Sequence, residues 1–170
     1  MNQDQKVVAI GAVCGIASMV SLVALFCWIL PPFVGYGEPI ARLTFALRTN
    51  LLALGPLFIG IIYVSSGRFF SEAIDPLRQT ESRSTQINIR FVNNTLEQSF
   101  LFVVGSTALA TLIDANSLKL ILALVMVFVL ARFVFWIGYR IKPVYRAAGM
   151  AATSFMNLGI FISVLYFLVK

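Results

Sequence analysis

Five runs of apolar residues dominate this sequence of 170 residues, and each run is long enough to cross a lipid bilayer. They lie at residues 7–30, 43–64, 89–113, 117–139 and 144–169. A helix rises about 1.5 Å per residue, so about 20 residues span the roughly 30 Å of bilayer hydrocarbon. Inside hydrocarbon a backbone must satisfy its own hydrogen bonds, which makes each run a helix. The sequence therefore predicts an all-α integral membrane protein with five spans.

Composition supports this class and excludes several kinds of function. Hydrophobic residues make up 59% of the chain, and charged residues only 12%, about half the charged fraction of a soluble domain. The sequence has no histidine, which excludes a histidine metal site, a Ser-His triad and a histidine general base. Its net charge of +6 comes from basic residues that border the apolar runs and meet lipid headgroups, so it does not indicate nucleic-acid binding. No metal site is predicted.

The charge of the connecting segments predicts the orientation in the membrane. In a chain with five spans, the N-terminus, the 65–86 loop and the 140–146 turn lie on one side. That side holds most of the basic residues: Lys6, Arg68, Arg78, Arg83, Arg140, Lys142 and Arg146, with Arg90 at the border. The other side holds Arg42, Lys119 and Lys170. The positive-inside rule then places the N-terminus and these two connections in the cytosol.

Short-range patterns add further expectations. The connections 114–117 and 140–143 are short, so the last three helices are predicted to be antiparallel neighbours. Asn116 or Ser117 is the expected cap of the fourth helix. Gly11 and Gly15 form a small-xxx-small pattern, which either docks the first helix on another or reflects the frequency of glycine in membrane helices.

Polar residues open the third apolar run, in the segment RFVNNTLE at 90–97. Charged groups in hydrocarbon cost roughly 2.5–3.5 kcal/mol each, so they need a reason. Arg90, Asn94 and Glu97 stand at i, i+4 and i+7, which places them on one face of a helix. The pattern predicts a polar stripe on an otherwise apolar helix.

The depth of Arg132 suggests a partner for this stripe. Glu97 and Arg132 each lie about 10 Å from the same membrane surface, on adjacent antiparallel helices, so we expect them to form an ion pair. Arg132 and Tyr139 share a face of the fourth helix, and Arg146 follows the next turn. The resulting wall is cationic. It is either a binding site for an anionic guest, because arginine binds carboxylates in a bidentate manner, or an interhelical lock.

The stripe, the segment ARFVFWIGYR at 131–140, and the following proline and Arg146 together resemble the MAPEG family. These are membrane-associated proteins in eicosanoid and glutathione metabolism. The resemblance covers residues 43–170 and implies a four-helix domain there, preceded by a segment 1–42 that holds an additional transmembrane helix and a Pro/Gly loop. A helix added before such a domain resembles the mattrin branch of the family.

The resemblance implies a homotrimer that binds glutathione between subunits at the cytosolic end, and a lipophilic small molecule that arrives from the bilayer. It implies that the peptide is held by Arg90, Asn94, Glu97, Arg132 and Tyr139, with Arg68 as a further contact. Arg146 resembles the arginine that stabilises the glutathione thiolate in active members, which act as transferases or peroxidases. An adjacent arginine raises the thiolate fraction by lowering the thiol pKa.

Two departures from the family pattern keep a second reading open. Asn93 occupies a position that is often basic, and the turn before Arg146 is short. The alternative is a non-catalytic membrane protein with a structural or trafficking role, in which the stripe is the lock. A transporter or channel subunit fits less well, because the other half of the bundle offers only Arg48 and Asn50 to line a path.

Overall fold

A computed structural model describes residues 1–71 and 81–170, and it is helical throughout these ranges except for short connections. The elements are α1 (Gln3–Ile29), α2 (Pro39–Ala53), α3 (Gly55–Phe69), α4 (Arg83–Leu112), η3 (Ala115–Ser117), α5 (Lys119–Ile141), η4 (Pro143–Arg146) and α6 (Ala147–Val169). Helices α2 and α3 together make one crossing, so the described residues contain five candidate membrane spans. The predicted all-α membrane fold is confirmed.

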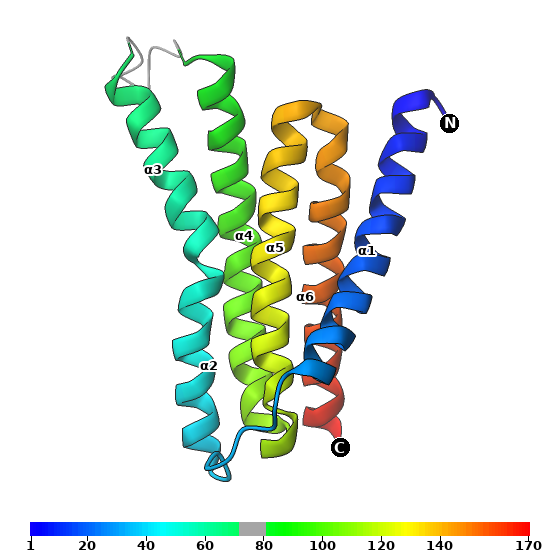
Figure 1. Ribbon diagram of the computed structural model, residues 1–170, viewed down its shortest axis with the longest axis vertical. Helices are drawn as coiled ribbons and strands as arrows, with labels where there is room; N and C mark the ends of the chain where they lie inside the picture. Colours follow the sequence, from blue (N-terminus) through cyan, green and yellow to red (C-terminus); the bar gives the residue numbers. More distant parts are fainter. Residues whose placement is uncertain (72–80) are drawn as a thin grey trace.

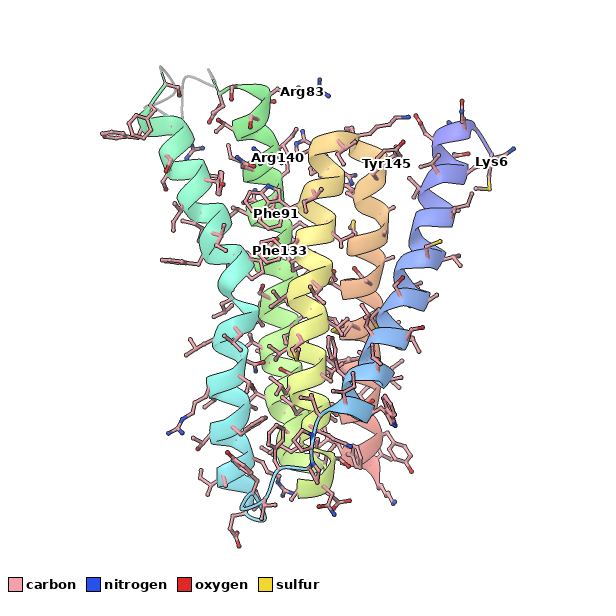
Figure 2. The ribbon with its side chains drawn as sticks, viewed as in Figure 1. Lys6, Arg83, Phe91, Phe133, Arg140 and Tyr145 are labelled. Atoms are coloured by element: carbon pink, nitrogen blue, oxygen red, sulfur yellow. The ribbon has the colours of Figure 1, made fainter. Side chains whose placement is uncertain are left out.

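The helices stand side by side, and α1 packs on α6 and α5 at one edge of the bundle (Figure 1). One end holds the N-terminus, the end of α3, the start of α4 and the η4 turn. We call it the basic end, because Lys6, Arg83 and Arg140 lie there (Figure 2). The opposite end holds the C-terminus and the connection between α1 and α2. Arg78 lies outside the described residues.

Local signals explain where the helices begin and end. The Asn2 side chain accepts a hydrogen bond from the Gln5 N–H at 2.8 Å, and the Gln5 side chain accepts one from the Asn2 N–H at 2.9 Å, which closes a capping box at the start of α1. The predicted cap of α5 is wrong. Asn116 and Ser117 lie within η3, and α5 follows Leu118 with no side-chain cap.

The crossing made by α2 and α3 is broken at Leu54, next to Pro56, which lacks an N–H for the helix ladder. Four residues before Leu54, in the last turn of α2, Asn50 is buried and donates to Ser106 Oγ and Thr107 Oγ1 on α4, both at 3.0 Å. Such interhelical hydrogen bonds contribute roughly 0.6–2 kcal/mol in a membrane. Asn50 therefore ties α2 to α4, and Arg48 is exposed.

Close backbone contact holds α1 against α6. Gly15 is buried, and a Cβ placed on it would overlap the Ala148 carbonyl. A Cβ on Gly11 would meet the Ala147 Cβ at 3.4 Å, an ordinary contact. The docking reading of the Gly11–Gly15 pattern is thus confirmed, with Gly15 as the position that requires the missing side chain.

Arg132 is the polar centre of the bundle. Its side chain is completely buried, and its guanidinium lies 4.4 Å from the centroid of the Phe135 ring. Its Nη2 donates to Asn94 Oδ1 and Thr95 Oγ1 on α4, both at 2.9 Å, and Nη1 donates to Thr153 Oγ1 on α6 at 3.1 Å. One side chain on α5 therefore joins three helices, and its charge is held by neutral oxygens.

The predicted ion pair between Glu97 and Arg132 is wrong. Glu97 is exposed, and the ion pairs within the described residues do not include it. The two residues match in depth, but Glu97 follows Thr95 by two positions, roughly 200° around the helix. Because Thr95 faces Arg132, the Glu97 carboxylate is turned away from the guanidinium.

We predict that Thr153→Val lowers the stability of the bundle by about 1–3 kcal/mol, because it leaves a buried guanidinium N–H without an acceptor. Thr44→Val is the matched control, since Thr44 is exposed and bonds only to its own helix at Ile40 O. Thermal unfolding in detergent measures both. Equal melting temperatures for the two variants would contradict the role of Arg132 as an interhelical tie.

We also predict that Gly15→Leu destabilises the packing of α1, because the new side chain would meet the backbone of α6 with no room to relax. Gly159→Leu is the control, because a Cβ at Gly159 meets nothing within 4 Å. Limited proteolysis of α1 and thermal unfolding report the effect. If both variants behave like the unmodified chain, the Gly15 contact does not hold α1 in place.

Candidate functional site

A polar cavity of about 260 Å³ lies between α4, α5, η4 and α6, toward the basic end. We call it the stripe cavity. Its lining consists of Arg90, Asn93, Asn94, Glu97, Phe135, Tyr139, Arg146 and Met150. It brings together most of the residues that the sequence indicated, from three separate segments of the chain: Arg90, Asn94, Glu97, Tyr139 and Arg146. The stripe predicted on α4 does face one space.

The α4 side of the cavity carries two charged side chains that make no ion pair or side-chain hydrogen bond within the described residues. Arg90 and Glu97 are exposed, and within the described residues neither makes an ion pair or a side-chain hydrogen bond. Asn94, between them on the same face, is half-buried, and its Oδ1 accepts the bond from Arg132. The Asn94 side chain therefore lines the cavity and also contacts the buried Arg132. The charged groups of Arg90 and Glu97 remain available to a ligand.

The opposite wall comes from the end of α5 and from η4. Tyr139 is buried, with 5% of its surface exposed, and the Arg146 guanidinium lies 4.9 Å from the centroid of its ring. This is a cation–π distance. The turn folds back closely because Gly138 has no side chain, since a Cβ there would lie 2.7 Å from the Tyr145 carbonyl oxygen. Gly138 thus allows Arg146 to reach the ring of Tyr139.

Arg146 is half-buried and has no ion pair or hydrogen bond to a protein acceptor within the described residues. Two guanidinium groups therefore face the stripe cavity together with one carboxylate, two carboxamides and a phenol. Guanidinium groups bind carboxylates and other oxyanions through paired hydrogen bonds. The site suits a small molecule that carries more negative than positive groups.

Two of the predicted site residues lie elsewhere. Arg132 is buried behind the cavity and is not among its lining residues. Arg68 lies in a neighbouring hollow of about 320 Å³ between α3 and α4, and its Nη2 forms an ion pair with Glu81 at 3.1 Å. Asn93 lines both this hollow and the stripe cavity, so the two spaces adjoin at that side chain.

The sequence reading missed several polar partners in the interior. Thr95 and Thr153 hold Arg132, and the Trp136 indole donates to Asn88 Oδ1 at 3.0 Å. Thr95 directly follows the stripe residue Asn94, and Thr153 lies among small residues in an apolar run. The sequence could have indicated these partners, because polar residues at matching depths on adjacent helices each need a hydrogen-bond partner inside the bilayer.

Comparison with known proteins assigns most of this architecture to one family. The model of the MAPEG family matches residues 45–166, which include most of α2 and all of α3 through α5 and most of α6. The matched region contains the stripe cavity, and α1 precedes it. No solved structure matches the chain.

Two curated relatives, from mouse and cattle, are both named Transmembrane protein 79. The protein from Mus musculus is 22% identical over 128 residues, which cover 75% of this chain and 32% of that protein. The protein from Bos taurus is 23% identical over 113 residues, which cover 66% of this chain and 28% of the relative. The chain thus spans about a third of the length of these relatives. Because the family model covers more than half of the chain, this protein belongs to the MAPEG family.

Proposed function

We propose that this protein binds glutathione in the stripe cavity. The observation that carries the proposal is that Arg90, Glu97 and Arg146 line one cavity and make no ion pair or side-chain hydrogen bond within the described residues. Glutathione offers two carboxylates, an ammonium group and a thiol. Its carboxylates and thiolate match the guanidinium groups, and its ammonium matches Glu97. Asn93 and the NH₂ of Asn94 add hydrogen-bonding groups for the peptide amides.

We propose further that Arg146 stabilises the glutathione thiolate. It comes from η4, whereas Arg90, Asn94 and Glu97 come from α4, and it has no ion-pair or hydrogen-bond partner within the described residues. A nearby guanidinium favours the ionised thiol and so increases the concentration of nucleophile at neutral pH. In a transferase reaction the thiolate sulfur would bond to the electrophilic carbon of a lipophilic substrate from the bilayer and displace its leaving group. In a peroxidase reaction the sulfur would attack a lipid hydroperoxide and release the alcohol, and a second glutathione would convert the sulfenic acid to the disulfide and water. Arg132 would act only indirectly, by fixing Asn94.

We propose that the protein is a homotrimer, as its family suggests, in which a neighbouring subunit completes the site. A cavity of about 260 Å³ lies just below the usual range of ligand pockets, roughly 300–1,000 Å³. Arg90 and Glu97 are exposed on the single chain, so a second subunit has access to the same face. We place the basic end in the cytosol, where the basic residues of the described chain concentrate and where glutathione is supplied.

A second candidate function is a non-catalytic structural or trafficking role in the membrane. It is favoured by the tie that Arg132 makes with Asn94, Thr95 and Thr153, because this part of the stripe holds helices together with no ligand. Under this alternative Arg90, Glu97 and Arg146 would be hydrated surface charges. The two functions differ in whether the stripe cavity binds glutathione.

Glutathione at millimolar concentration is expected to raise the melting temperature of the detergent-purified protein, because a ligand that binds only the folded state stabilises it. Glu97→Gln should weaken binding about tenfold or more, because it removes a charged partner of the ammonium group. Arg83→Ala is the control, an exposed basic residue at the same end that does not line the cavity. Absence of a shift in the unmodified protein would favour the non-catalytic role.

Arg146→Leu is expected to abolish conjugation of a lipophilic electrophile, because the thiolate loses its stabilising charge. Arg146→Lys, which keeps the charge without the planar fork, should retain part of the activity. Turnover and the ultraviolet absorbance of the bound thiolate are measured together. Arg146 would be removed from the mechanism if the leucine variant kept both the full rate and the thiolate signal.

A further inference from the structure

A second hollow lies on the other side of Arg146, next to the helix that precedes the family domain. It has a volume of about 340 Å³ between α1, η4 and α6. We call it the α1 hollow. Its lining consists of Val8, Ala12, Pro143, Val144, Arg146, Ala147, Met150 and Ala151. Two of these residues, Arg146 and Met150, also line the stripe cavity.

The α1 hollow has one charged group in an otherwise apolar lining. Val8 and Ala12 come from α1, and Ala147 and Ala151 face them from α6. Only Arg146 supplies a charge, and it has no protein acceptor within the described residues. The lining therefore suits a molecule with an apolar body and a negatively charged head.

The nearest acidic residue of α1 is already engaged. Asp4, one turn before Val8, forms an ion pair with Lys142 at 3.3 Å. This pair joins the start of α1 to the residue before η4, and it leaves Arg146 without a carboxylate partner from α1. The exposed Lys6 adds a further positive charge at this end. The electrostatic environment at the head of the α1 hollow is therefore cationic.

The position of the hollow fits a lipid chain. Val8 and Ala12 lie about 8–14 Å along α1 from its first residue at the basic end, the depth of the first acyl carbons when that end meets the headgroups. Helices α1 and α6 are in direct contact at Gly15, so the space beside that contact cannot admit another helix, which is about 10 Å wide. An acyl chain is thin enough to enter.

We propose that the α1 hollow binds a single-chain anionic lipid of the fatty acid class, with its carboxylate on Arg146 and its chain between α1 and α6. The volume of about 340 Å³ is that of a small-molecule pocket, which favours one chain over a two-chain phospholipid. This site stands on the geometry of α1, η4 and α6 and does not require that glutathione binds in the stripe cavity.

A photoactivatable palmitic acid, with its methyl ester for comparison, tests the proposal on the full chain in lipid nanodiscs. We expect labelling of peptides that contain Val8, Ala12, Val144 or Met150, and several-fold stronger labelling by the acid than by the ester. Ala12→Trp fills the hollow and should remove this labelling. Val13→Trp is the matched control, because Val13 is exposed and does not line the hollow.

Arg146→Gln should abolish the preference for the acid over the ester while the chain still enters the hollow. Thermal unfolding checks that each variant is folded, and Ala12→Leu replaces Ala12→Trp if the tryptophan variant fails this check. Equal labelling of the filled variant and the Val13 control, or equal labelling by acid and ester in the unmodified protein, would overturn the proposal. Glutathione binding is measured on the same samples, so its failure is recorded separately.

Discussion

The hydrogen-bond requirement of the bilayer interior organises this protein. Water is absent there, so each polar side chain must find a partner within the protein or remain near an end of the bundle. Asn50 meets this requirement with Ser106 and Thr107. Arg132 meets it at both terminal nitrogens with oxygens from α4 and α6, and its buried Nε has no hydrogen-bond partner within the described residues. These ties lie at different depths and connect α2, α4, α5 and α6. The apolar surfaces of the helices pack around them.

The polar stripe of α4 contains an interhelical tie and, next to it, a candidate binding surface. Asn94 of the stripe, with the neighbouring Thr95, belongs to the tie centred on Arg132. Arg90 and Glu97 make no ion pair or side-chain hydrogen bond within the described residues and face a cavity. A lock and a candidate binding site thus occupy adjacent residues of one helix. The amide of Asn94 links them, because it accepts from Arg132 and also lines the cavity.

The sequence predicts well whatever depends on length and helical period. The five spans follow from the apolar runs, and the shared face of Arg90, Asn94 and Glu97 follows from their spacing. It predicts poorly whatever depends on the rotation of one helix against another. Depth along the helices predicted that Glu97 pairs with Arg132. The rotation of α4 about its own axis instead turns Thr95 toward the guanidinium, and the sequence does not give that rotation. The α1 hollow required the actual crossing of α1 and α6, which spacing within one helix does not contain.

Because Arg146 lies in the connection between α5 and α6, its position depends on the length of that connection. Arg146 ends η4, and its approach to Tyr139 depends on the close fold of that turn over Gly138. Insertion of residues into this turn would move the guanidinium along the membrane surface while every helix kept its place. The length of this one connection therefore sets the position of the Arg146 guanidinium relative to Tyr139 and the stripe cavity.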